Sequence, residues 1–187
     1  MSYQKYQIKD LLKRHKKVVN IEDDITYKRI TIRINHNGVL LRDSLKGIEI
    51  GTKKQFKVNA DQFILSKIDA RQGAFGIVPK DADGAIITGN FWCYNINEKI
   101  VFPKWFLLFT KTNDFINLCK ESSSGNTHRK YLKEDIFLNH SLKIPSVEDQ
   151  KKIVKKLDLF DQFDLEVKKQ QLEINKIRYE LFRQSFE

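Results

Sequence analysis

The chain has 187 residues, of which 41% are hydrophobic and 11% aromatic, so it can bury one good core and is not disordered. Its 34 Lys and Arg against 24 Asp and Glu give a formal net charge of +10. No run of about 18 apolar residues is present to span a membrane, and the N-terminus lacks the apolar run of a signal peptide. We therefore expect a cytoplasmic protein. Cys93 and Cys119 are too few for a disulfide framework or a zinc site, and we expect both to be buried as small apolar side chains.

The excess positive charge lies entirely in the first part of the chain. Residues 1–147 hold 25 Lys and Arg against 15 Asp and Glu, whereas residues 148–187 hold 9 of each. A Lys-rich surface can serve solubility alone, but a genome-wide bias toward Lys would enrich both parts. The distribution favours a basic body that meets a polyanion and a neutral tail that meets protein.

The first elements combine a short helix with a hairpin. Ile8, Leu11, Leu12 and His15 mark one face of a predicted helix. In residues 30–35 the apolar positions alternate with polar ones, which predicts a half-buried strand. The pair Asn37-Gly38 tolerates positive φ, so we expect a hairpin turn there, leading into a strand from Val39.

Further short strands with Gly-bearing turns between them predict a compact, curved, mainly antiparallel sheet. Pro103 opens a predicted helix that runs to Glu121 and stops before the Ser-Gly loop of residues 122–125. A last irregular stretch then leads to Ile144-Pro145. The further strand-like runs are residues 47–50, 56–58, 63–68, 74–78 and 85–94.

The tail reads as one long helix. Ser146 and Asp149 form a capping pattern, and no Pro or Gly follows as far as Glu187. A helix of about 40 residues is about 60 Å long. The predicted fold class is α+β: a curved, mainly antiparallel β-rich domain with a few helices in residues 1–145, then a long coiled-coil-type helix in residues 146–187.

Apolar residues follow two rows along the predicted helix. The first recurs every seven residues, with Gln170 and Gln184 as polar interruptions, and it predicts a helix–helix seam. The second lies roughly 140° further round the helix and predicts a further protein surface. The alternative is a single amphipathic helix that packs back on its own domain, but such a helix needs only one apolar row for that contact. The first row is Ile153, Phe160, Phe163, Val167, Ile174, Ile177 and Leu181, and the second is Leu165, Leu172, Tyr179 and Phe186.

No motif of an active site or cofactor site stands out. The four histidines, 15, 36, 128 and 140, lack metal-ligand spacing, and no Gly-rich strand-to-helix turn offers a site for S-adenosylmethionine. Gly73 and Gly76 have the GxxG spacing of RNA-binding KH loops but lie between strand-like runs. Glu148 and Lys151 lack the paired Asp of a nuclease and read as solvated surface. We expect a reader and not a catalyst, with no catalytic residues, no metal and no cofactor of its own.

Residue chemistry nominates a set of DNA-binding residues. The basic ones are phosphate-binding types in or beside turns, and two amides are candidates for reading base edges because amides pair bidentately with adenine. The basic residues are Lys53, Lys54, Lys67, Arg71, His128, Arg129 and Lys130, and the amides are Gln72 and Asn90.

Four segments carry a resemblance to a known family. They are YKRITIRINHNGVLLRD, FILSKIDARQGAFGIVP, GAIITGNFWCY and, most specifically, SSSGNTHRKYLKEDIFLNHSLKIPSVEDQKKIVKKLD. Together they cover nearly the whole chain and resemble the target recognition domain of type I restriction-modification specificity subunits. The last segment is similar to the part of the family's sequences that leads from the recognition domain into the conserved helix. In that part a segment with Gly, Thr and basic residues precedes an Ile-Pro pair, and the helix then begins with two acidic residues and a Gln.

The resemblance implies a non-catalytic subunit that recognises a DNA sequence. It implies methyltransferase subunits as partners, joined by translocating restriction subunits, with S-adenosylmethionine, Mg and ATP bound by those partners. Family members usually carry two recognition domains and two conserved helices, whereas this chain has one of each and resembles a half-length form. Such a form can act as a homodimer, pair with another specificity chain, or be a silent cassette.

Two alternatives remain at the level of sequence. One is an enzyme, either a small nuclease or a methyltransferase-type protein, and the absence of a credible carboxylate-Lys or cofactor motif opposes it. The other is a scaffold or antirestriction decoy that dimerises through the tail without reading DNA, and the charge distribution and the resemblance oppose that.

Overall fold

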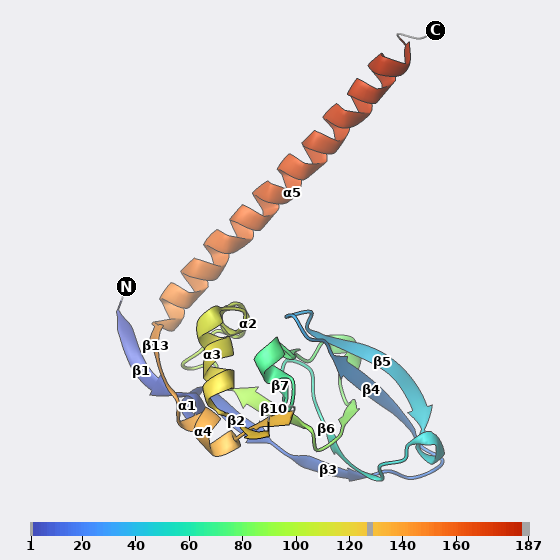
Figure 1. The fold of residues 1–187 in the computed structure, drawn as a ribbon, viewed down its shortest axis with the longest axis vertical. Coiled ribbons are helices and arrows are strands. Elements are labelled where there is room, and N and C mark those ends of the chain that lie inside the picture. The colour runs from blue at the N-terminus through green and yellow to red at the C-terminus, as the bar shows by residue number, and fades with distance from the viewer. Residues whose placement is uncertain (1, 127–128, 185–187) are drawn as a thin grey trace. The chain divides into compact units, whose positions relative to one another are not determined.

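The computed structural model describes residues 2–126 and 129–184, with the backbone alone at residues 126 and 129. It divides into two compact units, Met1–Val147 and Glu148–Glu187, which we call the body and the tail. Figure 1 shows that the α-helices of the body gather at one end and that a five-stranded sheet lies at the other, with β7 (Phe63–Ser66) and β10 (Phe91–Ile96) between them. This is the predicted α+β class, with sheets that are mainly antiparallel.

A four-stranded antiparallel sheet forms the centre of the body. Its strands lie in the order β2, β10, β7 and β8. All four residues of β7 are buried, because the strand is covered on both faces. Phe63 and Leu65 pack into the larger core cluster, while Ile64 packs on the opposite side with Val39 and Val78. The strands are β2 (Leu12–His15), β7 (Phe63–Ser66), β8 (Phe75–Ile77) and β10 (Phe91–Ile96).

The five-stranded sheet has the order β3, β6, β9, β4 and β5. Its longest pair is the hairpin of β4 and β5. In β5, after the buried Val39, exposed and half-buried residues alternate, as in a sheet with one solvated face. The alternating strand predicted at residues 30–35 is wrong in its bounds, because β4 ends at Ile32 and its last three residues are all half-buried. The single parallel pairing among the described strands joins Arg29 of β4 to Ile86 of β9. The strands are β3 (Lys17–Asn20), β4 (Thr26–Ile32), β5 (Val39–Lys46), β6 (Lys54–Lys57) and β9 (Ile86–Ile87).

Two small sheets and several short helices complete the body. In the larger core cluster, phenylalanine rings meet edge to face, with 5.1 Å between the ring centroids of Phe63 and Phe106 and of Phe75 and Phe115. The small sheets are β1 (Tyr3–Gln7) with β13 (Ser141–Pro145) and β11 (Ser123–Asn126) with β12 (Arg129–Leu132). The α-helices are α1 (Ile8–Leu11), α2 (Pro103–Thr110), α3 (Asn113–Glu121) and α4 (Glu134–Asn139), and the 3-10 helices are η1 (Gly47–Glu49), η2 (Ala70–Gln72) and η3 (Lys80–Ala82).

The tail is the predicted long helix, α5 (Val147–Gln184), with 38 residues. At 1.5 Å per residue, 38 residues give a length of about 57 Å. Acidic residues occupy its first turn and Arg183 its last, as the helix dipole favours. Among the described residues, no helix is both long and apolar enough to cross a membrane.

The prediction of a helix at the start of the chain is largely wrong. Only Ile8–Leu11 is helical, and the residues on either side are strands. Ile8 and Leu11 face the core as the helical spacing indicated. Leu12–His15, however, pairs with β10 along the edge of the central sheet, so tertiary pairing overrides the local period.

Other differences concern element boundaries. The strand predicted at residues 47–50 is wrong, because Gly47–Glu49 forms the 3-10 helix η1, in which the Ile50 N–H donates to the Gly47 carbonyl at 3.0 Å. The single helix predicted from Pro103 is two helices, since Thr112 caps the second and its hydroxyl accepts from the Phe115 N–H. The stretches predicted as loop and as irregular, at residues 122–125 and before Pro145, form β11 and β13.

Candidate nucleic-acid interface

The loop of residues 67–73, here called the central loop, joins β7 to β8 and meets two other segments through backbone hydrogen bonds. The Lys67 N–H donates to the Asn90 carbonyl at 2.9 Å. The Lys67 carbonyl accepts from the Leu132 N–H at 2.8 Å. Three regions far apart in sequence therefore lie side by side: the central loop, the turn that ends at Asn90, and β12.

A third neighbour of the central loop is the tip of the β4–β5 hairpin, residues 33–38, here called the hairpin tip. The Asn35 N–H donates to the Gln72 carbonyl at 2.7 Å, and the His36 N–H donates to the Gly73 carbonyl at 3.2 Å. Gly73 has φ +76°, and a Cβ there would lie 2.9 Å from the His36 nitrogen. The two segments can approach this closely only because residue 73 is glycine.

The turn of this hairpin lies two residues before the predicted position. Asn35 and His36 have φ of 57° and 59°, and the Asn37 N–H donates to the Ile34 carbonyl at 3.3 Å. Positive φ at both central residues defines a type I′ turn, which matches the twist of paired strands. Gly38, with φ +74°, follows the turn instead of forming it. The prediction of the hairpin is right, and its centre at Asn37-Gly38 is wrong.

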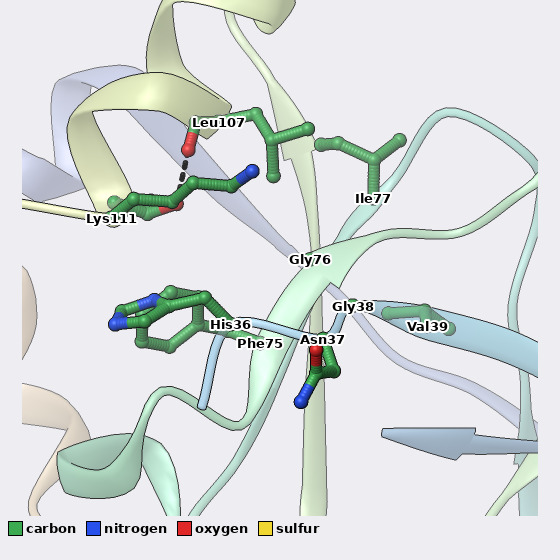
Figure 2. A pocket seen from close by; sticks show the side chains of 10 residues that line it. His36, Asn37, Gly38, Val39, Phe75, Gly76, Ile77, Leu107 and Lys111 are labelled. Carbon is green, nitrogen blue, oxygen red and sulfur yellow. Dashed lines mark hydrogen bonds between the residues drawn. The ribbon is translucent and has the colours of Figure 1, made fainter. Parts of the chain in front are cut away.

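The side chain of His36 anchors the hairpin tip. Its ring lies edge-on to Phe75, with 5.4 Å between centroids, and Figure 2 shows the two rings together below Lys111. They line a pocket of about 280 Å³ between the hairpin tip, β8 and α2. In the described part of the chain the Nδ1 atom of His36 is buried without a hydrogen-bond partner. The contact between the His36 and Phe75 rings holds the backbone of the hairpin turn in place.

Cations surround Trp92, which is only 9% exposed. The Lys67 ammonium lies 5.9 Å from the centroid of the Trp92 ring. The Arg14 guanidinium lies 5.3 Å from the same ring and 5.2 Å from that of Tyr94, and it pairs with Glu134 at 3.2 Å. Contacts with an aromatic face hold a cation in place, so Lys67 is positioned before any ligand arrives.

The structure brings Lys67, Arg71, Gln72 and Asn90 of the predicted set together around the central loop. The Arg71 side chain is half-buried, and its Nε is buried with no hydrogen-bond partner among the described residues. Gln72 and Asn90 are exposed. Lys130 is exposed on β12, two residues from the bond between Leu132 and the central loop.

The other predicted residues lie elsewhere or outside the described chain. Lys53 holds two loops together, since its ammonium bonds Asp23 at 2.6 Å and the Gly47 carbonyl at 2.8 Å. Lys54 begins β6 and is exposed. Arg129 begins β12, and His128 lies outside the described residues. The sequence reasoning passed over Asn35 and Arg14, although the run Asn35-His36-Asn37-Gly38 holds the residue types that tolerate positive φ.

Both thiols are buried as predicted. Burial raises the pKa of Cys93 to about 12, and it raises the pKa of Cys119 to about 12 as well. The Cys93 thiol donates to the Oε1 of Gln62 at 3.0 Å. Neither thiol is suited to nucleophilic work at neutral pH. Within residues 2–126 and 129–184, no group of three or more His, Cys, Asp or Glu side chains could hold a metal ion.

The apolar rows of the tail are exposed. Phe160, Phe163 and Leu181 of the first row are 70%, 70% and 62% exposed, while Ile153 is half-buried. The described members of the second row, Leu165, Leu172 and Tyr179, are 55–69% exposed, and Phe186 lies outside the described residues. So much exposed apolar surface on one helix marks a contact surface for protein.

Comparisons with known proteins agree with this picture. The model of the type I restriction modification DNA specificity domain matches residues 2–176. The HsdS subunit from Thermoanaerobacter tengcongensis has a similar fold, with a TM-score of 0.70 at 15% sequence identity over 93% of this chain and 46% of that one. A chain from a structural study of complex assembly and conformational transition of the type I R-M system is also similar. Its TM-score is 0.72 at 14% sequence identity, over 93% of this chain and 46% of that one.

The chain thus spans about half the length of these two solved structures, whose low identity establishes the fold alone. A comparison with curated proteins finds no match. The family model covers almost all of the sequence. The chain therefore belongs to the family of type I restriction-modification DNA specificity domains, a family of DNA-recognition and not of catalytic modules.

Proposed function

We propose that this chain reads one half of a bipartite DNA target and docks methyltransferase and restriction subunits of a type I restriction-modification complex. The observation that carries the DNA-reading half of the proposal is the convergence of the central loop, the hairpin tip, the turn at Asn90 and β12. These connected segments carry the cations Lys67 and Arg71 and the exposed amides Gln72 and Asn90. Cations position DNA through its phosphates and amides read base edges, so the site has both components of a specific reader.

The tail supports the second half of the proposal. The first row of α5 forms the seam with a second specificity chain, either another copy or a different one, in a coiled-coil arrangement. The second row, roughly 140° round the helix, faces a methyltransferase subunit. Large exposed apolar side chains on both rows are the support for this assignment. Two faces on one helix let it join two partners at once.

The chemistry lies in the partners. In this proposal the chain binds no cofactor, and S-adenosylmethionine, Mg and ATP belong to the methyltransferase and restriction subunits. The complex acts on DNA in the cytoplasm.

The experiment is co-expression of the full chain with a methyltransferase subunit of its own host, followed by mapping of methylated bases. The expected map shows a two-part site with an unread gap. Co-expression of the methyltransferase alone is the control and should leave that site unmethylated. A methyltransferase that modifies the same site without this chain would contradict the proposal.

Two other activities give different outcomes with the same protein. Incubation of the pure chain with plasmid and Mg²⁺ cuts the DNA only if the chain is a nuclease. A scaffold or antirestriction decoy would associate through the tail, with no preference for any DNA sequence.

A further inference from the structure

Two exposed residues with amide side chains have hydrogen-bonded backbones where the hairpin tip meets the central loop. Asn35 and Gln72 belong to segments 37 positions apart, yet the Asn35 N–H donates to the Gln72 carbonyl at 2.7 Å. Both side chains are exposed, and among the described residues neither side-chain amide has a hydrogen-bond partner. By contrast, the Asn37 amide bonds the Ile34 carbonyl at 3.1 Å, and the Gln62 amide bonds Asn95 at 2.6 Å.

The backbone that carries the two amides is held in place before DNA arrives. Asn35 is the first central residue of the type I′ turn, and the next residue, His36, is anchored against Phe75 (Figure 2). On the other side, the Gln72 N–H donates to the Asp69 carbonyl at 2.8 Å within η2. Fixed backbone lowers the entropy lost on binding, so contacts from these side chains discriminate well between bases.

The cations around the pair suit a base-reading site. Lys67 and Arg71 share the central loop with Gln72, and the exposed Arg33 shares the hairpin tip with Asn35. Phosphate contacts fix the register of a protein on the duplex, and base contacts then read the sequence. An amide offers one donor and one acceptor, which match the N6 and N7 edge of adenine in the major groove.

We infer that Asn35 and Gln72 are specificity-determining residues that read adenines at the same or neighbouring base pairs of the half-site. The inference rests on the proposed DNA-reading function and adds to it the residues and the base. Successive base pairs are about 3.4 Å apart along the duplex, and this spacing suits two side chains whose backbones are hydrogen-bonded to each other.

The test is selection of duplexes from a randomised double-stranded DNA library by the full chain, with sequencing of the bound fraction. The variants are Asn35→Asp and Gln72→Glu, which keep the shape of the side chain but replace the amide donor with a carboxylate that accepts only. A carboxylate pairs with the N4 donor of cytosine instead. Asp also tolerates the positive φ at residue 35. Asn20→Asp, at an exposed amide of β3, adds the same charge away from the pair.

We expect each variant to lose the adenine preference at one position, by a factor of roughly 5 to 140 against the other bases, with a shift toward cytosine there. The Asn20→Asp motif should equal that of the wild type. Thermal unfolding of all variants verifies that they fold. If Asn35→Asp binds no DNA, the neutral Asn35→Gly, which also suits positive φ, should show the same flattened position.

The outcomes separate the inference from the function beneath it. A wild-type chain that selects a motif, with both variants selecting the same one, overturns the roles of Asn35 and Gln72 and leaves DNA reading intact. A wild-type chain that selects no motif overturns DNA reading by this chain, and the inference with it. Loss of preference at a position that holds no adenine on either strand overturns the assigned base.

Discussion

At the scale of single residues, the interface depends on a glycine that touches no DNA in our proposal. Gly73 lets the hairpin tip approach the central loop, because any side chain there would press on the His36 backbone. The residues around it have separate tasks: His36 anchors the tip, Lys67 is held over Trp92, and Asn35 and Gln72 are left without partners among the described side chains. We therefore expect DNA sequence discrimination to be sensitive to the addition of one methyl group at residue 73.

Gly73→Ala is expected to destabilise the chain and to blur its sequence preference. An Ala at φ +76° costs about 1–2 kcal/mol for the left-handed backbone, and the close contact with His36 adds to that cost. Urea unfolding gives the change in the free energy of unfolding, and competition between specific and random duplexes gives the discrimination. Gly51→Ala is the matched control, since a Cβ there meets nothing within 4 Å. Equal discrimination by both variants would mean that the docked tip plays no part in reading.

Charge reversal at Arg129 and Lys130 is expected to weaken the salt dependence of DNA binding. If six phosphates are contacted, log K falls with log salt at a slope near −5, from about −0.9 per contact. Losing two contacts should reduce that slope by about 2, as measured by titration of a labelled duplex at several salt concentrations. Reversal of Lys155 and Lys169, both exposed on α5, changes the net charge equally and should leave the slope nearly intact. An unchanged slope in the β12 variant would remove that strand from the interface.

At the scale of elements, local sequence patterns predicted the helices and strands whose conformation depends on interactions between near neighbours in the sequence. Period-two alternation predicted the β4–β5 hairpin, and the long run without Pro or Gly predicted α5. The error at the start of the chain falls where distant pairing overrides a local preference. Leu12 to His15 has helical spacing but completes the central sheet beside β10. The candidate site follows the same rule. Residue type beside turns nominated Lys67 and Arg71, and amide chemistry nominated Gln72, while the docking of the hairpin tip depends on contacts that no local pattern contains.

The tail offers a prediction about association. Val167→Asp together with Ile174→Asp puts two charges in the proposed seam, where burying an unpaired charge costs several kcal/mol. We expect a loss of self-association or of pairing with a second specificity chain, measured as mass by light scattering at micromolar concentration. Gln162→Asp with Lys169→Asp lies outside both rows and should leave the mass unchanged. If the wild type is itself a monomer, alone and with a second specificity chain, the seam assignment is wrong, and Leu165 and Leu172 remain to be tested against the methyltransferase.

At the scale of the whole molecule, the proposal ties the length of α5 to the spacing of the DNA target. Two copies paired antiparallel through the first row would be related by a twofold axis and would read an inverted repeat. A helix of about 57 Å and base pairs about 3.4 Å apart set an upper limit of about 17 unread base pairs.

Deleting one heptad, residues 168–174, keeps both rows in phase and shortens the helix by about 10 Å. The gap in the methylation map should then shrink by about three base pairs, while each half-site keeps its sequence. Replacing the same seven residues with a scrambled heptad that keeps the two rows should leave the gap unchanged. An asymmetric two-part site would show that the partner is a different specificity chain, and an ungapped site would refute the role of the helix as a spacer.

The pairing of β1 with β13 has a consequence for how such proteins diversify. Tyr3 lies opposite Pro145, so the polypeptide enters and leaves the body at adjacent points, and the tail helix starts two residues later at Val147. Everything between these points can differ in length and composition while the two joints stay where they are. We therefore expect that a different reading module can be placed between this pair of edge strands, so that a complex joined through the tail would recognise a different DNA sequence.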